Sequence, residues 1–258
     1  MTEQQQTVAI IVPCWRDVDL ACAHAVEWSA FPSVAQVILA GVRGFESAAP
    51  RPEGVMVRWC AVPQPSRGAQ MNLGARSATA DILLFHHVDS KLTAAHLEAI
   101  TRSLQNEEII GGGFYRAFDE RHPGLRWFEK VERVHNRTFG TIYGDQSVFV
   151  RRDIFQRLGG FAPIPLMEDV ELSRRLRRAG RIALLDPPMR SSPQRQMEQG
   201  SWRVTWRNLS FLIAFRCGIS AHTLHRRYYG SNALQPVTAK SRIADEVLTP
   251  MPNRNYDR

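Results

Sequence analysis

Residues 8–13, with the sequence VAIIVP, decide the fold of this chain. The first five are all apolar and lack the polar alternation of a strand with one wet face, which is typical of a strand buried on both faces in a parallel sheet. A helical pattern follows, with apolar residues at Leu20, Ala23 and Val26. A buried strand followed by such a helix is the first unit of an open α/β sheet.

Strands and helices continue to alternate along the first half of the chain. We predict strands over 34–40, 55–62 and 81–87, and helices over 67–80 and 94–104. Beyond the glycines at 111–113 the pattern loosens, so we expect the second half to be built onto one edge of the first. Residues 231–258 are polar and proline-containing, which predicts a poorly ordered tail.

The composition is that of a soluble globular protein, with 44% hydrophobic and 22% charged residues. The formal net charge of +8 favours anionic partners such as phosphates, nucleic acid or acidic lipid head groups, without choosing among them. The four cysteines have neither metal-binding nor disulfide spacing, and we expect free, buried thiols. No signal peptide and no apolar stretch of about 18 residues is found, so we expect a cytoplasmic protein.

Polar clusters follow the ends of the predicted strands, where open parallel sheets bind their ligands. Arg67 opens a helix, and a guanidinium beside free backbone N–H groups suits a phosphate. His87 and Asp89 follow a strand and point to the same side, because the side-chain period of an extended chain is two. An imidazole and a carboxylate so placed could hold a divalent cation.

Two adjacent carboxylates, Glu168 and Asp169, stand between a proline-containing loop and a helix that ends at Gly180. A carboxylate at the mouth of a helix can act as a general base. Each of these residues also has a purely structural explanation. Asp169 could cap the helix, Arg67 could be a surface charge, Asp89 could start a turn, and the histidines could be hydrogen-bonded in the core.

Short motifs stand in a defined order along the chain. They are Ile11-Val12-Pro13, Arg67-Gly68-x-Gln70-Met71-Asn72, Leu84-Phe85-His86-His87-Val88-Asp89, Gly144-Asp145-Gln146, Gly159-Gly160-Phe161 and Met167-Glu168-Asp169. In this order they resemble a family 2 glycosyltransferase of the GT-A fold, and most of all a bacterial subgroup linked to arsenosugar biosynthesis. The similarity runs from about Val8 to Tyr229, and the Gly-Asp-Gln and Met-Glu-Asp segments are its specific part.

The resemblance implies a fold, and it implies that the two halves of the chain bind different substrates. It implies a single GT-A domain over 1–230, with a mixed, mostly parallel sheet flanked by helices. Residues 8–110 would form the nucleotide-sugar half and residues 111–230 the acceptor half. The implied partners are a nucleotide-sugar donor and a small-molecule or lipid-linked acceptor.

The resemblance also implies roles for individual residues. Asp169 would be the catalytic base of an inverting sugar transfer, and Asp89 with His87 would bind a divalent cation, Mn²⁺ or Mg²⁺. The donor-side residues would be Pro13, Asp17, Arg67, Gln70 and Asp89, and the acceptor-side residues Asp145, Gln146 and Glu168.

Two departures from the family pattern keep a second hypothesis open. His87 stands where the family often has the first Asp of its metal motif, and residues 37–44 lack the Asp that usually follows the second strand. A catalytically degenerate protein that binds a nucleotide or a partner is the alternative. A nucleotidyltransferase is disfavoured because residues 13–16 offer no Gly-rich triphosphate loop. The arginines of 174–178 lack interleaved aromatics, which disfavours nucleic-acid binding.

Residues 202–216 form a basic segment with aromatic and aliphatic residues at helical spacing. Trp202, Trp206, Leu209 and Ile213 follow this spacing. The segment predicts a helix that either lies on a membrane surface or packs against the domain. Large apolar residues occur on more than one face of the helix, so the sequence leaves both alternatives open.

Overall fold

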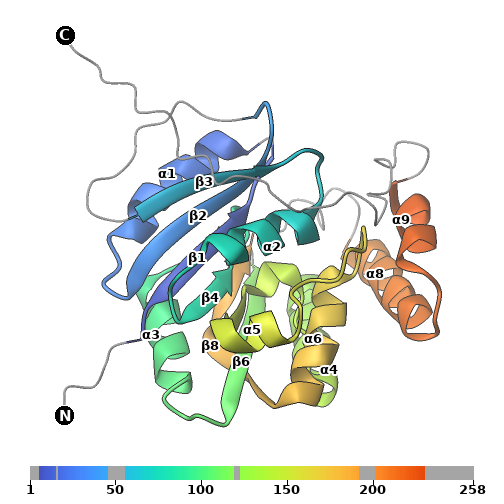
Figure 1. Ribbon diagram of the computed structural model, residues 1–258. Coiled ribbons are helices and arrows are strands. Elements are labelled where there is room, and N and C mark those ends of the chain that lie inside the picture. The colour runs from blue at the N-terminus through green and yellow to red at the C-terminus, as the bar shows by residue number, and fades with distance from the viewer. Residues whose placement is uncertain (1–5, 16, 46–55, 119–122, 192–200, 230–258) are drawn as a thin grey trace.

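The computed structural model describes residues 6–15, 17–45, 56–118, 123–191 and 201–229 (Figure 1). The tail predicted over 231–258 lies outside the described residues.

Within the described residues the core is a mixed eight-stranded sheet in the order β3-β2-β1-β4-β7-β6-β8-β5. Its strands are β1 (Val8–Pro13), β2 (Val34–Val42), β3 (Met56–Val62), β4 (Ile82–Phe85), β5 (Ser90–Lys91), β6 (Ile109–Phe118), β7 (Val148–Arg151) and β8 (Arg181–Ser191). β1 to β4 pair in parallel, whereas β7 runs antiparallel to both β4 and β6. The second half therefore extends the sheet beyond β4, as the sequence predicts.

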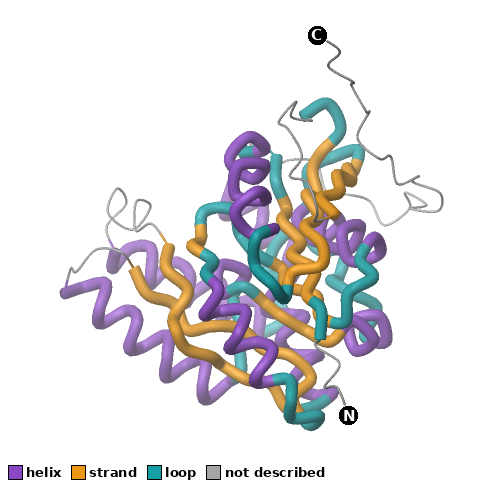
Figure 2. Tube along the Cα trace, turned by 90° about the vertical axis from the view of Figure 1, so that its left-hand side faces the viewer, coloured by secondary structure: helices purple, strands orange, loops and turns teal. Residues whose placement is uncertain are grey.

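Helices cover both faces of this sheet (Figure 2). The helices are α1 (Val18–Ser29), α2 (Arg67–Ser77), α3 (Ala94–Ser103), α4 (Pro123–Phe139), α5 (Arg152–Arg157), α6 (Glu168–Ala179), α8 (Ser201–Arg216) and α9 (Ala221–Tyr229). Alternate residues of β1 point to opposite faces: Val8, Ile10 and Val12 pack with α1 and α3, whereas Ala9 and Ile11 pack with α2, α5 and α6. Both faces of β1 are thus buried, which explains its unbroken apolar sequence.

The predicted elements of the first half are all present, with shifts at their ends. The helix predicted to run to Ala80 ends at Ser77, because Ala78 is extended and the side chain of Gln36 accepts hydrogen bonds from the N–H groups of Thr79 and Ala80. A polar side chain from β2 thus takes over the backbone donors that another helical turn would have used.

The cysteine prediction needs one correction. Cys14, Cys22 and Cys60 are free and buried, as expected, but Cys217 is exposed. Burial raises the pKa of the Cys60 thiol to about 12, so this group stays protonated and inert. Cys217 differs because it follows α8, in a turn at the edge of the domain.

The three glycines that weaken the sequence pattern lie inside β6. A side chain at Gly112 would overlap the carbonyl oxygen of Ala183 on β8, and one at Gly113 would overlap Ile142. β6 is therefore a strand whose neighbours approach its backbone closely, and only glycine leaves them room.

Replacing Gly112 with Ala should lower the free energy of unfolding by about 1–3 kcal/mol, the usual cost of overpacking. The added methyl group has no free volume, since the paired strand β8 lies against it. Denaturant unfolding measures the change, with Gln105→Ala at an exposed site as the control. Equal stability of the Gly112 variant and the control would refute the packing argument.

Candidate functional site

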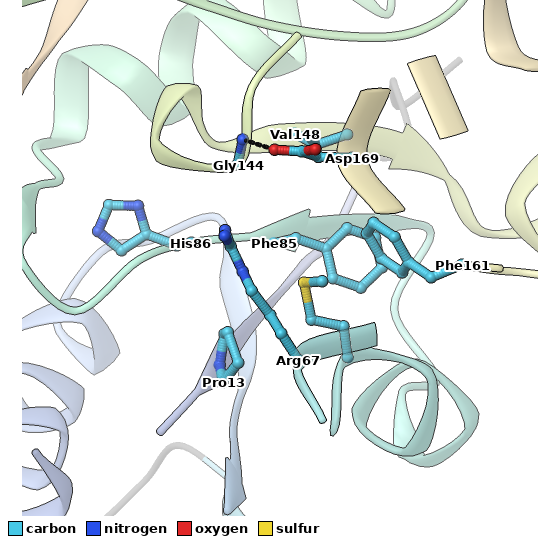
Figure 3. Close-up of a pocket in the computed structure, with 9 residues that line it drawn as sticks. Pro13, Arg67, Phe85, His86, Gly144, Val148, Phe161 and Asp169 are labelled. Atoms are coloured by element: carbon cyan, nitrogen blue, oxygen red, sulfur yellow. Dashed lines mark hydrogen bonds between the residues drawn. The ribbon is translucent and has the colours of Figure 1, made fainter. Parts of the chain in front are cut away.

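The candidate site lies where the carboxyl ends of β1 and β4 meet. α1 follows β1 on one face of the sheet and α2 precedes β4 on the other, so the chain direction of the connections reverses between these two neighbouring strands. Such a switch point opens a crevice beyond the strand ends, and ligands of open α/β sheets bind there. Pro13 from β1, Arg67 from α2, His86 after β4 and Asp169 from α6 line this crevice (Figure 3).

Arg67 occupies much of the crevice. Its guanidinium lies against the backbone of Gly144, so closely that a side chain there would overlap it, and its Nε atom lies 3.7 Å from Oε1 of Glu168. The remaining volume is about 10 Å³, which is room for roughly one water molecule. Arg67 thus reaches into the crevice from the start of α2, with 34% of its side chain exposed.

Asp169 faces Arg67 from the other wall of the crevice (Figure 3). Its Oδ2 accepts a hydrogen bond from the Gly144 N–H at 2.7 Å, and its Oδ1 accepts one from the Val170 N–H at 2.7 Å. Asp169 is the second residue of α6, and the N-cap position belongs to Met167, whose φ is 66°. The carboxylate is thus oriented by two backbone donors, and each oxygen keeps a lone pair for another partner.

Glu168 differs from its neighbour by being buried, with 6% of its surface exposed. Burial, followed by the negative charge of Asp169, raises the pKa of the Glu168 carboxyl to about 7, although Arg67 opposes the shift. The raised pKa means that Glu168 is protonated in part of the molecules at neutral pH.

His87 and Asp89 meet at the rim, after β4. The Nδ1 atom of His87 lies 3.0 Å from Oδ1 of Asp89, and the Asp89 side chain is 69% exposed. The hydrogen bond from His87 and the charge of Arg67 help to hold the pKa of Asp89 at about 2. No set of three His, Cys, Asp or Glu side chains with metal-binding geometry occurs among the described residues. The pair thus offers two metal-coordinating side chains, and the oxygen atoms of a bound ligand would have to complete the coordination of a cation.

His86 is a core histidine, as its structural explanation predicts. Its Nε2–H donates to the carbonyl oxygen of Ser90 at 3.0 Å, so its Nδ1 accepts the hydroxyl hydrogen of Ser147 at 2.7 Å. Burial lowers the pKa of His86 to about 3, which keeps the ring neutral. The ring fixes the loop after β4 against the turn that precedes β7.

Two of the predicted donor-side residues form hydrogen bonds with backbone groups of the protein. Asp17 accepts a hydrogen bond from the Trp15 N–H at 2.8 Å, within the loop after β1. Gln70 is 5% exposed, and its Nε2 donates to the carbonyl oxygens of Cys14 at 2.8 Å and Ala40 at 2.7 Å. Gln70 therefore joins the ends of β1 and β2 beneath the crevice instead of pointing into it.

The turn Gly144–Gln146 carries the predicted acceptor-side pair. Oε1 of Gln146 accepts a hydrogen bond from the Tyr143 N–H at 2.8 Å and so holds the turn together. Asp145 lies 2.6 Å from a guanidinium nitrogen of Arg116, which also lies 3.1 Å from Glu132.

Arg116 is a residue that sequence reasoning missed. Its side chain is 8% exposed and forms ion pairs with Glu132 and Asp145. It therefore joins the Gly144 turn to β6 and α4. Burial, and the like charge of Asp145, raise the pKa of the Glu132 carboxyl to about 7, although Arg116 opposes the shift. A charged residue near the end of a long strand was the only signal in the sequence, and its partners are remote along the chain.

The segment predicted as a helix over 202–216 is α8. It packs against α4 and α9, with Leu212 buried, while Trp206 is 62% and Ile213 53% exposed. The helix is thus attached to the domain and also presents apolar side chains outward. Across the described part of the chain, no helix combines the length and the apolar character needed to cross a bilayer.

Comparisons with known proteins bear on this geometry. The chain matches no family model and no curated protein sequence. Among solved structures it is similar to the mannosyltransferase PcManGT from Pyrobaculum calidifontis in complex with GDP-Man and Mn²⁺, with a TM-score of 0.58 and 17% identity. The match covers 88% of this chain and 70% of that one. The mixed sheet flanked by helices is the Rossmann-like α/β fold that this mannosyltransferase structure also has.

Proposed function

We propose that this protein transfers a sugar from a nucleotide-sugar donor to an acceptor hydroxyl. The observation that carries the proposal is the meeting of Arg67 and Asp169 in the crevice between β1 and β4. The fold is shared with a mannosyltransferase whose structure contains GDP-Man and Mn²⁺, which supports a nucleotide-sugar donor. A cation and a carboxylate on opposing walls are the two groups that such a displacement needs.

The donor diphosphate is assigned to the wall that carries Arg67. The guanidinium and the first N–H groups of α2 form a site for phosphate oxygens, because the helix N-terminus and the arginine both favour negative charge. Charge that develops on the leaving diphosphate is stabilised there as the bond to the sugar breaks. Pro13 forms the floor of the crevice at the end of β1, and Gln70 holds that floor in place.

Asp169 is assigned as the catalytic base. It takes the proton of the acceptor hydroxyl as that oxygen attacks the anomeric carbon. Its two backbone hydrogen bonds fix the carboxylate in one orientation, so little reorganisation precedes proton transfer. Asp169 and Arg67 lie on opposite walls (Figure 3), an arrangement that supports a single displacement with inversion.

His87 and Asp89 fit a divalent cation that a diphosphate would help to bind. Mg²⁺ and similar ions are commonly held by one or two carboxylates together with substrate phosphates and water. The exposed Asp89 carboxylate with its low pKa is ionised and accessible at the rim near Arg67. When bound, the cation would neutralise charge on the leaving diphosphate.

The finer assignment follows the sequence motifs. We infer a family 2 enzyme related to the arsenosugar-linked subgroup, acting in the cytoplasm on a small-molecule or lipid-linked acceptor. Asp145 and Gln146 shape the acceptor side through the Gly144 turn. The exposed face of α8 supports peripheral contact with a membrane, since Trp206 and Ile213 are accessible there. Nucleic acid is not among the proposed partners.

The donor site is tested by calorimetric titration with UDP, GDP and dTDP, each in Mn²⁺, Mg²⁺ or EDTA. One diphosphate should bind in a metal-dependent manner, and Asp89→Ala should weaken it by about tenfold or more, the effect of losing a charge-assisted contact. Asp153→Ala, at an exposed ion pair on α5, is the matched control.

Failure of all three nucleotides to bind would contradict the proposed function. Binding of a nucleotide without consumption of any nucleotide sugar would instead favour the catalytically degenerate alternative. Equal nucleotide affinity of the Asp89 variant and the control would show that Asp89 is not part of the donor site. The assignment of Arg67 to that site would not be affected by this result.

A further inference from the structure

A second, larger cavity borders α6, the helix that also supplies Asp169 to the crevice. Its volume is about 630 Å³, within the range of roughly 300–1,000 Å³ that small-molecule sites occupy. It is bounded by the C-terminal half of α6, the end of α4, and the turn between α8 and α9. None of the sequence motifs accounts for it.

The cavity is strongly basic. Arg174, Arg177 and Arg178 from α6 and Arg216 from α8 line it, and no carboxylate does so among the described residues. Glu171 lies 3.7 Å from Arg174. That carboxylate is already bound by Arg175 at 2.6 Å.

Ordinary structural roles explain only part of this charge. Arg177 and Arg178 lie in the last turn of α6, where cations are favoured, and Arg177 donates to the carbonyl oxygen of Thr138 at 3.0 Å. Arg216 donates to the hydroxyl of Thr141 at 2.8 Å and stacks on Phe139. Arg174 lies before the last turn, and the side chain of Arg178 has neither an ion pair nor a hydrogen bond within the described residues.

Apolar side chains line the same cavity. They are Phe139, Phe215 and Ile219, together with Val170 from the first turn of α6. A cavity that combines guanidinium groups with aromatic and aliphatic side chains fits an amphipathic anion, whose charged head binds the arginines and whose apolar body packs on the apolar side chains.

The cavity is also close to the proposed catalytic base. Val170 lines it and directly follows Asp169, which lines the crevice. Arg174 and Arg178 lie five and nine residues after Asp169 on the same helix, which corresponds to about 7.5 and 13.5 Å along its axis at 1.5 Å per residue. A molecule of ordinary metabolite size can span that distance.

We propose that this cavity binds the phosphate head of an amphipathic molecule, and that this molecule is the acceptor of the sugar. The second part rests on the proposed function, whereas the first part does not. Arg174 and Arg178 bind the phosphate, the apolar side chains of the cavity pack against the rest of the molecule, and its hydroxyl reaches toward Asp169.

The first test is calorimetric titration of the full chain with octyl phosphate, methyl phosphate and octyl glucoside. Octyl phosphate should bind most tightly, because it alone combines both features of the cavity. The double variant Arg174→Gln, Arg178→Gln should weaken its binding by about tenfold or more, since each guanidinium makes a charge-assisted contact. The matched control is the double variant Arg157→Gln, Arg181→Gln. Both arginines are exposed and lie outside the cavity, and their replacement removes the same amount of charge.

A second arm identifies the source of the phosphate. Sedimentation with phosphatidylcholine vesicles containing phosphatidic acid tests a lipid head group, and octyl phosphate tests a soluble ligand. Loss of either binding in the double variant but not in the control supports the cavity. Absence of both, or equal binding by variant and control, overturns it. Nucleoside diphosphate binding, measured in the same variants, should be unchanged and reports separately on the proposed donor site.

Discussion

Replacing Asp169 with Asn should lower the rate of sugar transfer by about 10²–10⁴-fold, the usual contribution of a general base. Asn keeps the shape of the side chain but cannot take up the acceptor proton. One of the two backbone hydrogen bonds, from Gly144 or Val170, loses its acceptor, which costs about 1 kcal/mol of stability. The fall in rate therefore exceeds what the structural change explains.

The measurement is release of the nucleoside diphosphate from the donor identified by titration, in the presence of acceptor. Nucleotide affinity and the unfolding midpoint are measured on the same sample, and Asp153→Asn is the control at an exposed site. A purely structural residue would lose nucleotide affinity and activity together. A folded Asp169→Asn protein that turns over at the parental rate would eliminate Asp169 as the base.

Replacing Arg116 with Met should lower the free energy of unfolding by about 3–5 kcal/mol, the range seen when one partner of a buried ion pair is removed. Asp145 and Glu132 would be left facing each other without the cation between them. The Gly144 turn, whose N–H donates a hydrogen bond to Asp169, would lose its attachment to β6. Both stability and activity should therefore fall.

Denaturant unfolding measures the effect of Arg116→Met, with Arg157→Met as the control, because an exposed pair contributes only about 0–1 kcal/mol. Adding Glu132→Gln to the Arg116 variant should restore part of the loss, since one buried charge is then absent. A loss as small as that of the control would show that the buried ion pair contributes little to stability.

The sequence predicts the first half of the fold well because its signals are local. The apolar run 8–12 identifies a strand buried on both faces, and Gly180 ends α6 as expected. The glycines of β6 read as a break in the pattern, since only the approach of Ala183 and Ile142 explains them. Their role depends on strand pairing, which no local pattern contains.

The same distinction applies to the candidate site. Arg67 and Asp169 could be found because each stands at an element end that the sequence marks. Arg116 could not, because its partner Asp145 is 29 residues away. The sequence motif predicts Gln70 on the donor side, but its amide donates to two backbone carbonyl groups. A sequence pattern does not indicate which backbone groups will lie near a side chain.

The Arg67 side chain fills most of the crevice in which a ligand is proposed to bind. The guanidinium already rests on Gly144 beside Glu168, in a space with room for little more than one water molecule. A diphosphate at the proposed donor site would therefore enter by exchange, drawing the guanidinium away from Gly144 and Glu168 and toward the phosphate oxygens. Its affinity would be the difference in free energy between these two arrangements of Arg67. Glu168, which favours the first arrangement, would thereby lower the affinity.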